Sequence, residues 1–147
     1  MSHVLITGAA RGIGLELCRL YAKRGDTVLA VCRGVSPELA SLGVTVLEGV
    51  ELTHQSDVIN LAAALRGRSI DLAILNAGVL SVESFGDLEK EVSVFLVHPG
   101  YVQTDMTGGR GDSTPAESAE RIARLLDRLG PSDSGTFWHA NGTPLPW

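Results

Sequence analysis

A glycine-rich turn near the N-terminus constrains this sequence more than any other feature. The short apolar run Val4 to Thr7 has the character of a buried strand, and a cluster of glycines follows it directly. Apolar residues then recur at helical spacing up to Gly25, a typical helix stop. Glycines at such a turn let the backbone approach a pyrophosphate, which the free N–H groups and the helix dipole hold. The turn therefore predicts a dinucleotide site, and its expected residues are Gly8, Arg11, Gly12, Ile13 and Gly14.

Strands and helices alternate along the rest of the chain. Several short runs are too apolar to alternate with polar residues, which is typical of parallel strands covered on both faces. These runs lie at 27–32, 44–47, 70–75 and 92–97, and a last short strand is expected at 136–138. The pattern predicts an α/β fold, a Rossmann-type doubly wound parallel sheet in three layers. A chain of 147 residues and 15.5 kDa has room for one ordinary domain, so we expect a single domain over 1–147.

Two of the expected helices have specific start signals. One carries an apolar face of Val58, Leu61, Ala62 and Leu65, and either Thr53 or Ser56 is its expected N-cap. The other begins at Thr114-Pro115-Ala116-Glu117, which has the spacing of a capping box with proline at the first helical position. Its buried face is expected to comprise Ala119, Ile122, Leu125, Leu126 and Leu129.

Composition argues against several classes of partner. Seventeen acidic against twelve basic residues give a net charge of −5 with no basic run, so nucleic acid is excluded as an expected partner. The apolar runs are far shorter than the roughly 20 residues that span a bilayer, and residues 1–3 lead directly into a strand. We therefore expect a cytoplasmic protein without membrane contact. Cys18 and Cys32 have no metal-ligand spacing, which predicts reduced core thiols and no metal site.

The residue after the second strand bears on the choice between NAD and NADP. A chain that selects NAD commonly has a carboxylate there, against the ribose 2′-hydroxyl, whereas this chain has Cys32-Arg33-Gly34. Arg33, together with Arg11, could bracket a 2′-phosphate with guanidinium groups. The alternative is that both are solvated surface arginines. We expect NADP(H) to be preferred over NAD(H).

Four motifs follow one another in order along the chain. They are Thr7 to Gly14, Glu51-Leu52, Leu75 to Gly78, and His98 to Met106. In spacing and order they resemble the motifs of the short-chain dehydrogenase/reductase family, and residues 135–147 look like the ending of its C-factor and carbonyl-reductase-like branch. The chain departs from the family pattern in having Glu51 for the usual Asp and Leu75 for the usual first Asn. The resemblance implies that Glu51 and Leu52 contact adenine, that Thr104 lies beside the nicotinamide amide, and that the site also includes Asn76, Ala77, Gly78, Pro99 and Gly100.

The residues that carry out hydride transfer in that family are missing from this sequence. Family members use a Ser, a Tyr and a Lys, with the last two spaced Tyr-x-x-x-Lys. The only tyrosines are Tyr21 and Tyr101, and the only lysines are Lys23 and Lys90. The positions where their partners would stand hold Gly25, Asp105, Arg19 and Gly86. None of these 147 residues therefore qualifies as the catalytic pair.

The same resemblance indicates where the segment with the catalytic residues would lie in the sequence. Family members carry several tens of residues between the Asn-Ala-Gly turn and the Pro-Gly loop, whereas only 79–98 lie between them here, and the discontinuity falls near 89–92. Either the natural polypeptide has a further segment at this point, or the chain is an internally deleted remnant. We favour the first interpretation because both flanks match the family closely. The short form would leave an exposed sheet edge and apolar face that invite self-association, so a homo-oligomer is possible.

Two functions stay open from the sequence. The first is an NADP(H)-dependent oxidoreductase acting on a small carbonyl or alcohol, with its catalytic residues outside these 147. The second is a non-catalytic NADP(H)-binding sensor or signalling protein, similar to the roles suggested for the C-factor branch. Both predict a dinucleotide partner.

Overall fold

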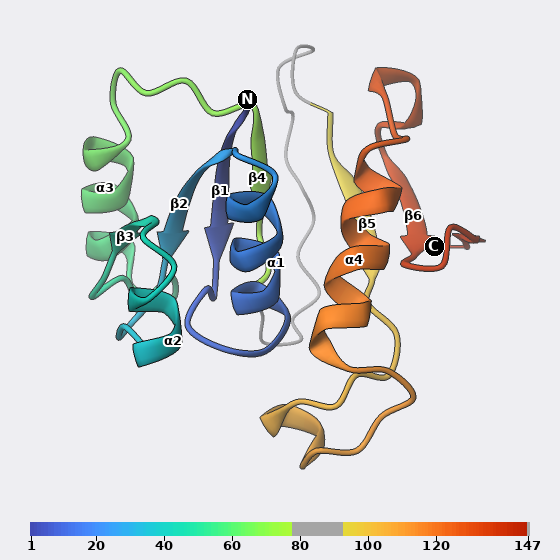
Figure 1. Cartoon of the computed structure of the whole chain (residues 1–147). Coiled ribbons are helices and arrows are strands. Elements are labelled where there is room, and N and C mark those ends of the chain that lie inside the picture. The colour runs from blue at the N-terminus through green and yellow to red at the C-terminus, as the bar shows by residue number, and fades with distance from the viewer. Residues whose placement is uncertain (78–92, 147) are drawn as a thin grey trace. The chain divides into compact units, whose positions relative to one another are not determined.

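The described residues form two sheets (Figure 1). The computed structural model describes residues 1–77 and 93–146, which fall into two units, the first ending at Gly78 and the second beginning at Val79. The expected discontinuity near 89–92 lies outside the described residues, as does Gly78. Each unit is described by itself below.

The sheet of the first unit is entirely parallel. Its strands are β1 (His3–Thr7), β2 (Thr27–Val31), β3 (Thr45–Leu47) and β4 (Leu72–Ile74), in the order β3-β2-β1-β4. Val4 of the central strand β1 lies opposite Val28 of β2 and Leu72 of β4. The carboxyl ends of the strands therefore meet at one edge, which is where ligands bind in open α/β sheets.

Helices cover both faces of this sheet. The helices are α1 (Gly12–Lys23), α2 (Pro37–Ala40) and α3 (Gln55–Ala64). On one face, Leu5, Leu29 and Val31 form a buried cluster against which Leu61 and Leu65, at the end of α3, are packed. Val4 and Ile6, which alternate with Leu5 along β1, are fully buried and point to the other face of the sheet. Helix α1 packs on β1 and β2 and covers that face (Figure 1). This is the doubly wound arrangement that the sequence predicts.

Two expectations for α3 are wrong. Its N-cap is His54, and neither Thr53 nor Ser56 caps it. The reason is that the Thr53 hydroxyl donates to Glu51 Oε1 at 3.1 Å and the Ser56 hydroxyl lies 3.3 Å from Asp57 Oδ1. Val58 and Ala62, expected on the inward face, are both exposed, Val58 to 41%. The helix is thus held by its C-terminal leucines.

The second unit holds a smaller mixed sheet. Strand β5 (Phe95–His98) pairs in parallel with β6 (Thr136–His139), which pairs antiparallel with β7 (Pro144–Leu145). Two 3₁₀ helices, η1 (Asp105–Thr107) and η2 (Pro131–Asp133), lie in its loops. Strands β4 and β5 belong to different sheets, so within the described residues β4 pairs only with β1.

Helix α4 (Pro115–Leu126) begins as the sequence predicts. The Glu117 carboxylate accepts from the Thr114 N–H at 2.8 Å, and the Thr114 hydroxyl accepts from the Glu117 N–H at 3.2 Å, completing the capping box. Ala119, Ile122 and Leu125 are buried as expected. The remaining predicted members of that face, Leu126 and Leu129, are only half-buried.

Three further features concern the cysteines, the helix lengths and the candidate metal ligands of the described residues. Both cysteines are buried free thiols, and burial, with a smaller effect from Cys32, raises the pKa of Cys18 to about 12. Among the helices in the part of the chain that the structure describes, none has the length and apolar character needed to cross a membrane. Those same residues hold no group of three or more His, Cys, Asp or Glu side chains suited to a metal ion.

Candidate functional site

The β1–α1 turn places three glycines where side chains would not fit. Gly8 and Gly12 have left-handed backbones, with φ of 65° and 56°. Gly14, in the first turn of α1, is packed so tightly that a Cβ there would collide with the Gly8 carbonyl and lie 2.7 Å from Asn76 Nδ2. The requirement for glycine at these positions is thus imposed by backbone conformation and by close packing.

A second turn, after β4, clamps the first one. Asn76 Nδ2 donates to the carbonyl oxygens of Thr7 at 3.1 Å and Gly8 at 3.4 Å. The Ala77 N–H donates to Thr7 Oγ1 at 3.0 Å. The structure therefore brings together the Asn76-Ala77 motif and the glycine turn, which the sequence places about half the chain apart. Their hydrogen bonds fix the turn from the side of β4.

The N-terminus of α1 is suited to an anion. Arg11 is the N-cap residue, with an extended backbone and no side-chain hydrogen bond to the first turn. The first turn of α1 contains no acidic residue. Its N–H groups and the positive end of the helix dipole therefore meet no carboxylate of the helix itself, and the absence of a Cβ at Gly14 keeps the turn close to the helix. These features fit the pyrophosphate of a dinucleotide.

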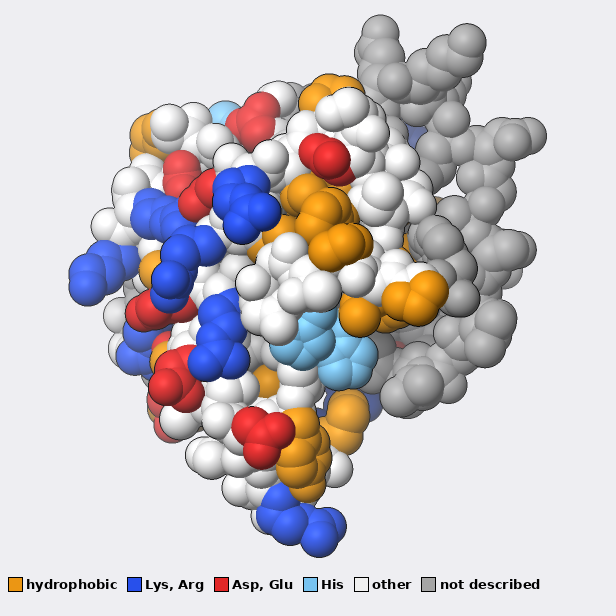
Figure 2. Space-filling view, turned by 90° about the vertical axis from the view of Figure 1, so that its right-hand side faces the viewer, with side chains coloured by type: hydrophobic (Ala, Val, Ile, Leu, Met, Phe, Trp, Pro, Cys, Tyr) orange, Lys and Arg blue, Asp and Glu red, His pale blue; other side chains and the backbone are white. Residues whose placement is uncertain are grey.

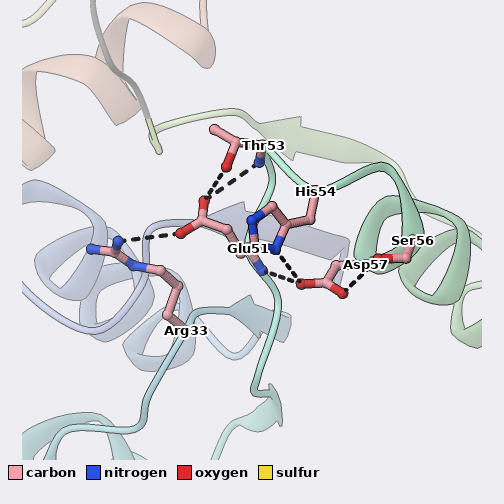
Figure 3. Close-up of polar contacts among 6 residues, drawn as sticks. All are labelled: Arg33, Glu51, Thr53, His54, Ser56 and Asp57. Atoms are coloured by element: carbon pink, nitrogen blue, oxygen red, sulfur yellow. Dashed lines mark hydrogen bonds and ion pairs between the residues drawn. The ribbon is translucent and has the colours of Figure 1, made fainter.

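The ends of β2 and β3 carry an ion pair (Figure 3). Arg33 follows β2 and Glu51 follows β3, and Arg33 NH1 lies 3.3 Å from Glu51 Oε2. The Arg33 side chain is 73% exposed, whereas that of Glu51 is 31% exposed. Sequence analysis treated the two residues separately and missed this contact. The contact depends on the register of the parallel strands, in which Val31 lies opposite Leu47, and no local sequence signal indicates it.

The Glu51 side chain is held on more than one side. Its Oε1 accepts from the Thr53 hydroxyl at 3.1 Å and faces the Thr53 N–H at 3.4 Å, while its own N–H donates to Asp57 Oδ2 at 3.0 Å (Figure 3). The hydrogen bonds from Thr53, with a smaller contribution from Arg33, lower the pKa of the Glu51 carboxyl. Glu51 is therefore a charged carboxylate at neutral pH. Leu52 lies in the same turn, half-buried.

The Pro-Gly loop belongs to the second unit. The Pro99 carbonyl accepts from the Ser118 hydroxyl of α4 at 3.0 Å, and the Gly100 N–H donates to His98 Nδ1 at 3.0 Å. Thr104 precedes η1, and its N–H donates to Thr107 Oγ1 at 3.0 Å. Pro99 and Gly100 are thus held to α4 and to the end of β5, and Thr104 is held within the loop.

Two histidines lie beside that loop, a pairing that the sequence did not indicate. The rings of His98 and His139 stack with centroids 5.4 Å apart, and two imidazoles are visible side by side at the surface (Figure 2). Each Nδ1 accepts a backbone N–H, from Gly100 and from Asn141 respectively. His98 is thus a strand-end histidine bonded to the backbone. The cause of the stacking is the register of β5 and β6, which places the two residues opposite each other.

A model of the family "short chain dehydrogenase" matches residues 2–92, more than half of the chain. The chain belongs to the short-chain dehydrogenase family. That family is one of oxidoreductases, and the Rossmann-type sheet and the glycine turn described above are the parts of the chain that this match covers.

Two relatives illustrate how this family member compares in sequence. The 1-hydroxy-2-glutathionyl-2-methyl-3-butene dehydrogenase of Rhodococcus sp. (strain AD45) is 28% identical over 226 positions, covering all of both proteins. Because this chain has only 147 residues, part of that relative has no counterpart here. C-signal of Myxococcus xanthus is 44% identical over 77 residues, which are 51% of this chain and 45% of C-signal. The chain thus spans less than half the length of that second relative.

A solved structure supports the fold of this family member. The NADPH-bound carbonyl reductase from chicken fatty liver superposes with a TM-score of 0.76 at 19% identity, covering 100% of this chain and 99% of that one. At that identity the likeness concerns the fold. It confirms the Rossmann-type α/β class predicted from the sequence.

Proposed function

We propose that this short-chain dehydrogenase binds NADP(H) and serves an oxidoreductase reaction on a small carbonyl or alcohol. The observation that carries the proposal is the glycine turn, which is fixed by Asn76 and opens onto an N-terminus of α1 without carboxylates. A dinucleotide pyrophosphate has the charge and the small cross-section that such a turn accepts. The NADPH bound to the chicken carbonyl reductase supports the same cofactor here.

Each group of residues has a part in holding the dinucleotide. Gly8, Gly12, Ile13, Gly14 and the backbone at Arg11 would receive the pyrophosphate, and Arg33 a 2′-phosphate, since no carboxylate directly follows β2. Adenine would lie at Glu51 and Leu52. By resemblance to the family, the residues expected at the nicotinamide end are Asn76, Ala77, Gly78, Pro99, Gly100 and Thr104. When bound, the dinucleotide supplies hydride chemistry, and these residues bind and orient it.

The acid and base of the reaction are not among these 147 residues, since the sequence contains no Tyr-x-x-x-Lys pair. The alignment with the Rhodococcus dehydrogenase, which is longer than this chain, supports the interpretation that the natural polypeptide has a further segment. In that case the segment carries the catalytic Tyr and Lys, and the described residues position the cofactor.

A non-catalytic NADP(H)-binding sensor is the second candidate. The observation that favours it is the absence of a Tyr-x-x-x-Lys pair, which under this proposal is also absent from the functional protein. The similarity to a protein called C-signal supports a signalling role. The glycine turn would then serve binding alone.

Mass and turnover together separate the two candidates. The intact mass of the natural protein is measured first, followed by NADPH oxidation with a panel of small aldehydes and ketones. A mass well above 15.5 kDa with turnover supports the oxidoreductase, whereas a mass near 15.5 kDa with NADPH binding and no turnover supports the sensor. Absence of any dinucleotide binding refutes both.

The cofactor preference has its own test. Arg33→Ala should weaken NADPH binding and leave NADH binding nearly unchanged, because only NADPH carries the 2′-phosphate. Arg124→Ala, which removes another exposed arginine paired with a glutamate, is the matched control. Unchanged NADPH affinity in Arg33→Ala would show that the NADP preference is wrong.

A further inference from the structure

The arginine expected to recognise a 2′-phosphate already has an anionic partner in this chain. One nitrogen of its guanidinium, NH1, faces Glu51 Oε2 at 3.3 Å. The other donors of the Arg33 side chain, NH2 and Nε, have no hydrogen bond among the described residues. A guanidinium offers five donors in a planar fork, so an incoming phosphate would share this group with the carboxylate.

Glu51 cannot easily move away from Arg33. Its second oxygen is engaged by Thr53, and its backbone N–H is bound by Asp57 (Figure 3). Asp57 belongs to the first turn of α3, so the backbone that carries this carboxylate is anchored to a helix. Arg33, by contrast, projects into solvent, with 73% of its side chain exposed. In this pair the carboxylate is the fixed member and the guanidinium the adaptable one.

We propose that Glu51 sets how strongly this chain prefers a 2′-phosphate over a 2′-hydroxyl, by sharing the Arg33 guanidinium with the nucleotide. This inference rests on the proposed function. A 2′-phosphate gains the guanidinium charge but also meets the Glu51 charge next to it. An uncharged ribose 2′-hydroxyl meets no such repulsion and can donate to a carboxylate. The pair therefore holds the preference for NADP(H) below what Arg33 alone would give.

The size of the effect follows from the exposure of the pair. The repulsion between the Glu51 carboxylate and a 2′-phosphate is screened strongly by water, because the Arg33 side chain that they share is mostly exposed. We expect removal of the Glu51 charge to raise the preference for a 2′-phosphate about three- to tenfold at low salt. The gain should shrink at high ionic strength, where exposed charges are screened further.

The test uses two probes that differ only at the 2′ position, adenosine 5′-monophosphate and adenosine 2′,5′-bisphosphate. Their dissociation constants are measured by calorimetry for the unmodified chain and for Glu51→Gln, which keeps the shape and an oxygen acceptor for Arg33. Glu120→Gln is the matched control, because it removes the same charge from another exposed Arg–Glu pair, at 3.1 Å on α4. Thermal melting of each variant reports on folding.

We expect Glu51→Gln to tighten binding of the bisphosphate relative to the monophosphate, and Glu120→Gln to leave that ratio unchanged. In an Arg33→Ala background, where no guanidinium remains to share, the effect of Glu51→Gln should be smaller. An equal effect in both backgrounds, an unchanged ratio or a lower ratio would each overturn the inference. If neither probe binds the unmodified chain, the proposed function fails as well, whereas binding of both with no effect of Glu51→Gln refutes only the sharing of Arg33.

Discussion

Gly14 is the position where one added methyl group should do the most damage. A Cβ there would collide with the carbonyl of Gly8, lie 2.9 Å from the Gly8 carbonyl carbon and lie 2.7 Å from Asn76 Nδ2. The first two of these atoms are backbone, and the third belongs to the side chain that clamps the turn. None of them can yield without disturbing the β1–α1 turn.

The magnitude for Gly14→Ala combines three contributions. Forcing a methyl group into a packed site costs about 1–3 kcal/mol. Displacing Asn76 weakens its two hydrogen bonds to the turn, worth about 1 kcal/mol each. Alanine in a helix gains about 1 kcal/mol over glycine. The expected net loss of unfolding free energy is about 2–4 kcal/mol when both hydrogen bonds are lost, a large part of the stability of an ordinary domain.

Urea unfolding followed by circular dichroism measures this loss. Gly34→Ala is the control, because a Cβ there meets nothing within 4 Å and its backbone is not left-handed. The control should change the free energy of unfolding by no more than about 0.5 kcal/mol. If Gly14→Ala were as stable as Gly34→Ala, the close approach of Gly8, Gly14 and Asn76 would not exist in solution.

Three further outcomes are expected. The Cys18 thiol, whose pKa burial raises to about 12, should resist alkylation at pH 8 until the chain unfolds, and rapid modification of the native protein, mapped by mass spectrometry, would contradict its burial. Thr114→Ala should cost about 1 kcal/mol at neutral pH. The Thr114 N–H, and to a smaller extent its hydroxyl, lower the pKa of Glu117 in the folded state, so their contribution is present above the unfolded pKa and lost as pH falls below about 4. Thr114→Ala removes only the hydroxyl of these two donors, so part of its cost should disappear in acid, and urea titrations giving the same cost at pH 3 and pH 7 would disprove this. Leu75→Ser should reduce any self-association seen by analytical ultracentrifugation, since that side chain is 70% exposed; an unchanged mass distribution would show that another surface is responsible.

The elements with strong local signals were predictable from the sequence. The capping box at Thr114 predicts the start of α4, and the apolar run before the glycine turn predicts β1. In both cases the local preference and the tertiary structure agree. The glycine turn was predictable for the same reason, because its backbone conformation and the close packing at Gly14 tolerate hardly any residue other than glycine.

The features that depend on contacts between distant segments were not predictable in the same way. The position of Val58 at the surface depends on how α3 packs, and only Leu61 and Leu65 of its apolar residues join the core cluster of the sheet. The pair of Arg33 and Glu51 depends on the relative register of β2 and β3, which the composition of each strand does not specify. Short elements such as β7 carry too few residues for a periodic signal.

The most direct test of the account is a titration of the 15.5 kDa chain with NADPH, followed by the backbone amide resonances. The account predicts saturable shifts that are largest at the β1–α1 turn, from Gly8 to Gly14, and at Asn76 and Ala77, which are bonded to that turn. Shifts that are absent at saturating NADPH, or that leave the glycine turn unaffected, would contradict the proposal that this turn holds the dinucleotide.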